Sequence, residues 1–94
     1  MKKIQNYDNY LIDENGKVYN EITKRYLKGS IGENSYLYYR LSRNGKKKMF
    51  YAHRLVAETF LDNPNCLPVV DHKDGNKLNN NVTNLEWVSY SENT

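Results

Sequence analysis

The chain has 94 residues, of which 38% are hydrophobic and nine are tyrosine, so we expect one small domain with a thin core rich in aromatic rings. No stretch approaches the roughly 18 apolar residues of a membrane span, and no apolar segment near the N-terminus predicts a secretory signal. The single cysteine, Cys66, excludes an internal disulfide and a cysteine-cluster zinc site, which favours a reduced, cytoplasmic setting.

The net charge of +3 is unevenly distributed. Residues 1–54 hold 12 Lys and Arg against 5 Asp and Glu, whereas residues 55–94 hold 2 Lys against 6 Asp and Glu. A basic half of this kind favours a polyanionic partner such as nucleic acid. The alternative is that these cations only keep a small protein in solution.

Two strands near the N-terminus, at residues 10–12 and 17–19, are predicted to form a hairpin. The connecting segment ends in Asn15-Gly16, and Asn-Gly is the strongest two-residue turn signal because both central positions take positive φ. A short third strand is expected at residues 26–28.

A second hairpin is predicted at residues 36–41 and 46–51, around the turn Asn44-Gly45. With a two-residue turn, Arg43 pairs with Lys46, Arg40 with Met49, and Tyr38 with Tyr51. We expect a basic, tyrosine-flanked ribbon that contacts DNA, with the cations Arg40, Arg43, Lys46, Lys47 and Lys48 as contact residues. A solvated hairpin tip without a partner is the alternative.

A helix is predicted at residues 53–61, because Ala52, Leu55, Val56 and Phe60 fall near one stripe and Asn63-Pro64 follows. His53 and Arg54 lie in its first turn, where a cation opposes the helix dipole unless an anion binds there. Both residues are therefore candidate DNA phosphate contacts. A surface pair without a role is the alternative.

The rest of the chain predicts a strand at residues 67–70, a loop rich in Asn, Asp and Gly, and a returning strand at residues 85–88. The Ser89–Glu92 segment then fits a capping box, so a helix should begin at about Tyr90. This arrangement brings Asp71 and His72, at the end of one strand, close to Asn84 at the start of the other. The helix can bring Asn93 back towards Asp71.

Side chains of this kind suit phosphodiester hydrolysis. Asp71 and Asn93 are oxygen donors, which Mg²⁺ or Mn²⁺ prefers, and a neutral His72 imidazole can take a proton from water. The nitrogen of His72 that remains free depends on what the other bonds, and Asn84 or a backbone carbonyl could fix it. The hypothesis requires the imidazole to reach solvent.

Other sites fit the segment less well. Lys73, Gly75 and Val82 occupy ligand positions of an EF-hand loop, which argues against calcium. Cys66 has no local activating signature, and two separated histidines with one cysteine make zinc unattractive. An Asx-rich loop closed by Asp71 and Asn84 hydrogen bonds, with no chemistry, is the structural alternative.

The segment from Ala52 to Asn93 resembles the HNH endonuclease family, specifically phage and intron-associated homing endonucleases. The motifs that carry the resemblance are DHKDGNKLNN, NLEWV and the closing SEN. Residues 1–51 resemble, more loosely, the DNA-contacting module that often precedes such nucleases. The resemblance implies an α+β fold in two regions: a basic antiparallel sheet module at 1–51 and, at 52–94, a helix followed by the ββα-metal motif.

The resemblance also implies residue roles. His72 matches the general base, and Asn84 the central Asn that supports the hairpin and orients that base. Asp71 matches the carboxylate metal ligand, and Asn93 the ligand on the last helix. The implied reaction is hydrolysis of double-stranded DNA with one divalent ion, Mg²⁺ or Mn²⁺, in a bacterial or phage-infected cell.

The sequence departs from the family in stopping at Thr94, directly after Asn93. The last helix of the motif is therefore expected to be truncated, with a loosely held ligand, unless a homodimer completes the site. The rival hypotheses are a DNA-binding module without catalysis and a small interaction protein that retains the motif.

Overall fold

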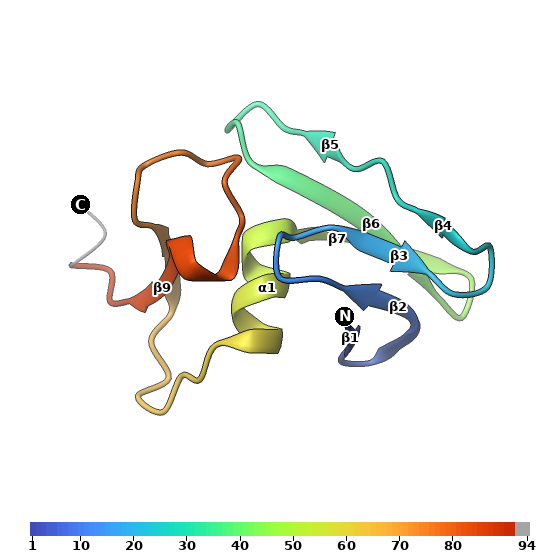
Figure 1. The fold of residues 1–94 in the computed structure, drawn as a ribbon, viewed down its shortest axis with the longest axis horizontal. Coiled ribbons are helices and arrows are strands. Elements are labelled where there is room, and N and C mark those ends of the chain that lie inside the picture. Colours follow the sequence, from blue (N-terminus) through green and yellow to red (C-terminus); the bar gives the residue numbers. More distant parts are fainter. Residues whose placement is uncertain (92–94) are drawn as a thin grey trace.

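The computed structural model describes residues 1–91 and gives them an α+β architecture of three antiparallel sheets around one α-helix (Figure 1). The first sheet has the order β1 (Lys2–Ile4), β2 (Tyr7–Ile12), β3 (Val18–Asn20), β4 (Arg25–Tyr26). The second has the order β5 (Ser30–Ile31), β6 (Leu37–Arg43), β7 (Lys46–Tyr51), and the third pairs β8 (Val69–His72) with β9 (Leu85–Val88). Helix α1 spans Ala52–Phe60, and a 3₁₀ turn, η1, spans Val82–Asn84.

The β6–β7 hairpin has the predicted register. Arg43 pairs with Lys46, Arg40 with Met49 and Tyr38 with Tyr51. Asn44 and Gly45 have φ values of 53° and 77°, which is the geometry that a two-residue Asn-Gly turn requires. Alternate residues of β6, including Tyr39 and Leu41, face the core, whereas Arg40 lies on the opposite face. The cations nearer the turn, Arg43, Lys46, Lys47 and Lys48, are exposed as well.

The first hairpin differs from the two-residue turn implied by Asn15-Gly16. Only Gly16 has positive φ, at 86°, and the loop runs from Asp13 to Lys17 between the paired residues Ile12 and Val18. The Asp13 carboxylate accepts hydrogen bonds from the backbone N–H groups of Asn15 and Lys17, both at 2.9 Å. This side-chain cap stabilises a longer turn, which we call the β2–β3 turn (residues 13–17).

The α1 helix begins and ends within one residue of the prediction, and it lies between the β8–β9 hairpin and the two larger sheets (Figure 1). Its inner face buries Leu55, Val56 and Ala57. One continuous core joins both halves of the sequence, and its buried members are Ile4, Tyr10, Ile12, Val18, Tyr39, Leu41, Ala52, Leu55, Val56, Ala57, Val70 and Leu85. The regions 1–51 and 52–94 thus share their hydrophobic contacts.

Strand β8 starts and ends two residues later than predicted, so Asp71 and His72 are its last two residues. The reason is local: the Asn63 side chain donates to the carbonyl of Leu67 and accepts from its N–H, at 2.9 and 2.8 Å. Leu67 is therefore already paired and does not extend the ladder, and Pro68 has no N–H to donate. Strand β9 matches the prediction, whereas β1, β5 and η1 were not predicted.

The helix expected to begin at about Tyr90 lies mostly outside the described residues, as does Asn93. Within the described part, Tyr90 and Ser91 form a turn. No helix in residues 1–91 is long and apolar enough to span a membrane.

Candidate active site

Asp71 and His72 occupy adjacent positions of β8, so their side chains leave the strand on opposite faces. His72, opposite Leu85 on β9, faces the interior and is 6% exposed. The imidazole is therefore buried, whereas the hypothesis from the sequence requires it to reach solvent. Asp71, opposite Glu86, is half-buried, and its carboxylate makes no hydrogen bond or ion pair with another described residue.

The His72 ring belongs to an aromatic cluster. Tyr36 stacks on His53 and His72, with centroid distances of 4.8 and 5.9 Å, and the two imidazole centroids lie 5.0 Å apart. Tyr51 completes the cluster beside His53 at 5.5 Å. The ring faces of His72 are thus held by neighbours from the segment before β6 and from α1.

Lys77, in the loop after β8, places a cation beside this cluster. Its Nζ lies 4.8 Å from the centroid of the Tyr36 ring and donates to the carbonyl of Asn34 at 3.1 Å. Because Tyr36 stacks directly on His72, Lys77 is one ring away from the candidate base. No sequence motif distinguishes Lys77 from the other surface cations.

His53 is not the surface cation expected from the sequence. It is 8% exposed, and burial lowers its pKa to about 4, with smaller contributions from His72 and Arg54. A histidine with such a pKa is neutral at pH 7. Its position places it inside the candidate site, against the general base, rather than on a DNA-facing surface.

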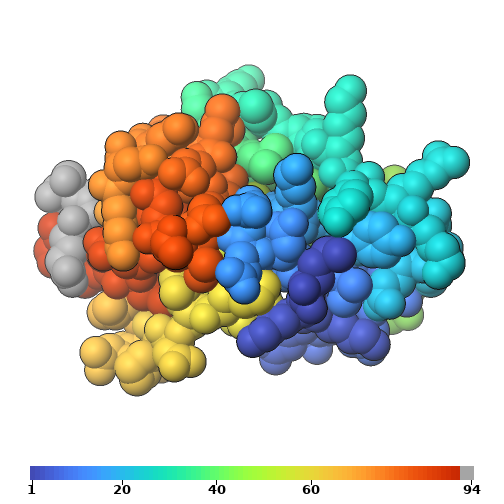
Figure 2. All heavy atoms as spheres, in the orientation of Figure 1, coloured from blue at the N-terminus to red at the C-terminus, as the bar shows by residue number. Residues whose placement is uncertain are grey.

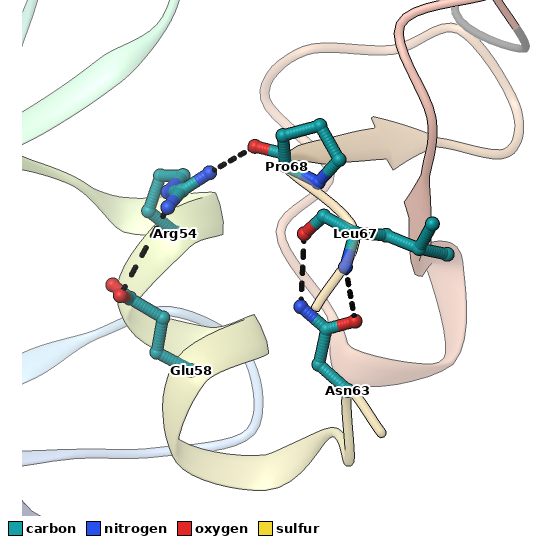
Figure 3. Close-up of polar contacts among 5 residues, drawn as sticks. All are labelled: Arg54, Glu58, Asn63, Leu67 and Pro68. Atoms are coloured by element: carbon teal, nitrogen blue, oxygen red, sulfur yellow. Dashed lines mark hydrogen bonds and ion pairs between the residues drawn. The ribbon is translucent and has the colours of Figure 1, made fainter. Parts of the chain in front are cut away.

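Arg54 is engaged within the fold (Figure 3). One guanidinium nitrogen donates to the carbonyl of Pro68 at 2.8 Å, and the other lies 4.0 Å from the Glu58 carboxylate. The guanidinium also lies 5.1 Å from the centroid of the Trp87 ring. These contacts connect α1 to the start of β8 and to β9, so Arg54 has a structural role whether or not it meets DNA.

The partner of the His72 Nε2 atom is Asn80, whose Oδ1 lies 2.9 Å away. Asn80 is 3% exposed. Because Oδ1 can only accept, this contact requires a proton on Nε2, and in a neutral imidazole Nδ1 is then the nitrogen with the lone pair. The only sequence signal was the run Asn79-Asn80-Asn81, which read as part of a polar loop.

His72 Nδ1 has no hydrogen-bond partner among the described residues. In that part of the chain, Trp87 Nε1 is the one fully buried side-chain polar atom without a partner. Among the described residues, Nδ1 is thus the His72 nitrogen that remains available for a further contact, although the ring as a whole is enclosed.

Asn84 has one of its two expected roles. Its side chain donates to the Asp74 carboxylate and to the Asn79 carbonyl, both at 2.9 Å, and accepts from the Asp74 N–H at 3.2 Å. It therefore closes the loop between β8 and β9, as predicted. The acceptor for His72 Nε2 is the Asn80 side chain, and not Asn84 or a backbone carbonyl, the two partners considered from the sequence.

Asp74 receives a further hydrogen bond from Asn79, at 2.9 Å. The pKa of Asp74 is lowered by the Asn79 amide first, and then by the Asn76 backbone N–H and the Asn84 amide. The Asx-rich loop of the structural alternative is present and Asn84 closes it, but the carboxylate partner is Asp74 instead of the expected Asp71.

The donor set fits a hydrated divalent ion. Residues 1–91 contain no group of three or more His, Cys, Asp or Glu side chains that could enclose a metal. They do provide the unpaired carboxylate of Asp71 at the strand end. Mg²⁺ commonly uses one or two carboxylates with water and phosphate oxygens as its remaining ligands, so a single described carboxylate is compatible with it.

The five expected DNA contacts of the β6–β7 hairpin, Arg40, Arg43, Lys46, Lys47 and Lys48, are all exposed. Arg43 and Lys48 also line a groove of about 520 Å³ together with Lys2 and Lys3 of β1. The basic surface thus continues onto β1, a strand that the sequence did not predict.

Comparison with known proteins identifies the second half of the chain. Residues 50–94 match the family model described as HNH endonuclease. They belong to the HNH endonuclease family. The resemblance stated for Ala52 to Asn93 is confirmed, and the matched segment contains the whole β8–β9 hairpin of the candidate site.

The relatives extend over nearly the whole chain. An uncharacterized HNH endonuclease of Acanthamoeba polyphaga mimivirus is 50% identical over 98% of this chain. The DNA endonuclease I-HmuI of Bacillus phage SP01 is 43% identical over 94% of it. The chain spans 28% and 51% of the length of these two relatives.

A solved structure of the HNH homing endonuclease I-HmuI, described as showing DNA binding and cleavage, has the same fold. It aligns with a TM-score of 0.91 and 42% identity over 98% of this chain and 53% of that one. The α+β architecture, including the sheets that precede the HNH segment, is therefore shared with I-HmuI. These relatives do not support the homodimer that was considered as a way to complete the site.

Proposed function

We propose that this chain is the DNA-binding and cleaving unit of a metal-dependent HNH homing-type endonuclease that hydrolyses phosphodiester bonds of double-stranded DNA. One observation carries the proposal: the Asp71 carboxylate and the His72 imidazole are consecutive on one strand of the HNH segment. Within residues 1–91, the carboxylate and the Nδ1 atom of the imidazole have no hydrogen-bond partner. The names of the relatives support endonuclease activity as the class of reaction.

In this mechanism His72 is the general base. Its Nδ1 takes a proton from a water molecule, whose oxygen attacks the scissile phosphorus while the bond to the 3′ oxygen breaks. The products are a 5′-phosphate and a 3′-hydroxyl. Asp71, with Asn93, which lies outside the described residues, would hold a divalent ion, Mg²⁺ or Mn²⁺. When bound, such an ion stabilises the negative charge that develops on the leaving oxygen.

The enclosure of His72 suits this task. Rings of Tyr36 and His53 lie along the imidazole, and its Nε2 is occupied by Asn80, so only Nδ1 is available for proton transfer. A neutral His53 adds no positive charge next to the base. Lys77, beside Tyr36, is a cation within reach of a phosphate bound at this edge of the site.

Binding of duplex DNA is assigned to the exposed cations of the β6–β7 hairpin and to the adjoining lysines of β1. A two-stranded ribbon with basic side chains can follow phosphates or enter a groove. His53 is not retained among the contacts because it is buried and neutral, and Arg54 is retained only as a structural residue.

A plasmid-nicking assay in Mg²⁺ and in Mn²⁺ tests the proposal. We expect nicking by the wild-type chain, and its loss by at least about 100-fold in His72→Ala and Asp71→Ala, given the usual contribution of a general base. Asp62→Ala, which removes an exposed carboxylate away from β8, is the matched control and should cleave normally. Full activity of His72→Ala would falsify the assignment, and salt-sensitive binding without cleavage in either metal would favour the DNA-binding alternative.

A further inference from the structure

We infer that Asn80 is the positioning residue of the His72 imidazole, and that the β2–β3 turn, in the N-terminal half of the chain, holds Asn80 in place. Asn80 fixes one tautomer and one ring orientation of His72. The contact between Asn80 and the β2–β3 turn gives the N-terminal hairpin a part in catalysis that is separate from DNA binding. Its catalytic consequence rests on the proposed function, whereas the tautomer and orientation do not.

The hydrogen bond between His72 Nε2 and Asn80 Oδ1 fixes both properties of the ring. A neutral imidazole has one donor and one acceptor nitrogen, so an acceptor 2.9 Å from Nε2 selects the Nε2–H tautomer. Rotating the ring by a half turn about its Cβ–Cγ bond would exchange Nε2 for a carbon. The Asn80 oxygen, in a side chain that is 3% exposed, would then be left without this donor, which is unfavourable for a buried acceptor.

The two residues that follow Asn80 are each tied to the β2–β3 turn. The backbone N–H of Val82 donates to the Glu14 carbonyl at 2.8 Å. The Asn81 side-chain amide donates to the Asn15 side-chain oxygen. In Figure 2 the orange and red spheres of this loop lie directly against the blue spheres of the turn.

Gly16 makes the closest approach to Asn80. A Cβ atom added at Gly16 would lie 2.9 Å from the Asn80 Cβ, too close for any other residue without a shift. The φ of Gly16, 86°, also favours glycine. The Tyr39 hydroxyl donates to the Gly16 carbonyl at 2.9 Å, so the turn is itself fixed to β6. Rigid support of this kind is what a catalytic side chain needs to stay in a productive geometry.

The first experiment is ¹⁵N NMR of the histidine side chains in the full chain at pH 8, which needs no variant. We expect His72 in the Nε2–H tautomer. In Asn80→Leu, which has similar volume and no acceptor, this preference should be reduced, and in Asn80→Asp, which keeps an oxygen at the same place, it should be retained. Asn79→Leu is the matched control, because Asn79 bonds Asp74 and not His72.

The second experiment is cleavage and DNA binding by the same variants. Asn80→Leu should lower kcat by about tenfold or more with the DNA Kd within twofold, because a positioning residue acts on the chemical step. Gly16→Ala should give a smaller loss of kcat in the same direction and should weaken the Nε2–H preference.

Separate outcomes overturn the two ideas. An Nδ1–H tautomer in the wild type, or an unchanged tautomer in folded Asn80→Leu, rules out the positioning role. A normal His72 tautomer and kcat in folded Gly16→Ala rules out the part of the β2–β3 turn. A wild-type chain with the expected tautomer and no cleavage in either metal sinks the proposed function alone. If Asn80→Leu fails to fold, the wild-type tautomer and Asn80→Ser decide the matter.

Discussion

The imidazole rings of His53 and His72 lie with their centroids 5.0 Å apart, at an interplanar angle of 51°. His53 comes from the first turn of α1 and His72 from the end of β8, and both are buried. Two imidazoles this close and this enclosed do not readily carry a charge together. The candidate base therefore has a neighbour that stays neutral.

The first prediction concerns stability against pH. Because the pKa of His53 is about 4 in the folded chain and 6.5 in its unperturbed state, the unfolded chain binds more protons between these values. The contribution of His53 is thus present above pH 6.5 and lost as the pH falls towards 4, by up to roughly 3 kcal/mol. Urea unfolding at a series of pH values measures it.

His53→Phe is the control for that measurement, since it keeps an aromatic ring beside Tyr36 and cannot titrate. Its free energy of unfolding should vary less with pH over the same range. An identical pH slope in the wild type and His53→Phe would show that His53 is not the group responsible.

The second prediction concerns the β6–β7 hairpin. Changing Arg43, Lys46 and Lys47 together to Gln should weaken duplex binding and reduce the slope of log affinity against log salt by about 3, given about 0.9 for each phosphate contact. Reversing the three charges to Glu should abolish binding. Fluorescence anisotropy with a labelled duplex at several salt concentrations gives both quantities.

Lys17, Lys24 and Lys28, which are exposed on the other large sheet and its connections, provide a control with the same change of net charge. Their triple Gln variant should retain most of the salt slope. Equal losses in the two triple variants would mean that overall charge, and not the hairpin, determines binding.

The third prediction separates a structural arginine from a DNA contact. Arg54→Ala removes the hydrogen bond to the Pro68 carbonyl and the contact with Trp87, and should lower the free energy of unfolding by about 1 to 2 kcal/mol. Glu58→Ala removes only the 4.0 Å ion pair and should cost less than about 0.5 kcal/mol. Urea denaturation measures both variants; a reduced salt slope of DNA binding in Arg54→Ala, with stability unchanged, would reverse the assignment.

The fourth prediction concerns the loop between β8 and β9. The hydrogen bonds to Asp74 hold its pKa below the ordinary 3.8, so their stabilisation is present above that pH and is lost as the pH falls through the folded pKa. Asn79→Ala removes the largest cause and should raise the Asp74 pKa towards 3.8 in a ¹³C NMR titration. Asn65→Ala, in an exposed turn and without a side-chain hydrogen bond to the described residues, should leave it unchanged.

The sequence predicted those parts of the fold that depend on neighbouring residues. The Asn44-Gly45 turn and the alternation of Leu37, Tyr39 and Leu41 determine the register of β6 and β7, and both can be recognised within a few residues. The predicted start of β8 was wrong because the Asn63 side chain forms hydrogen bonds with both the N–H and the carbonyl of Leu67. The residue patterns that predict strands do not reveal this competition.

Only part of the candidate site could be predicted, because the rest depends on side chains that are distant in the sequence. Asp71 and His72 stand in a recognisable motif, but the enclosure of His72 depends on Tyr36 and His53, and its orientation on Asn80. Asn80 in turn is placed by the distant Gly16. Asn93 lies outside the described residues, so its proposed part in metal binding stays a prediction.

The continuous core that joins β2, β3 and β6 to α1, β8 and β9 bears on how such nucleases are engineered. A graft that joins a new recognition sheet to the β8–β9 hairpin at the Tyr51–Ala52 junction would remove buried apolar contacts. It would also remove the hydrogen bonds that Glu14 and Asn15 form with the loop before β9. Retargeting should therefore begin at the exposed side chains beside the Asn44-Gly45 turn, such as Arg43 and Lys46. Cleavage specificity is then altered at exposed residues, while the buried core is kept unchanged as one unit.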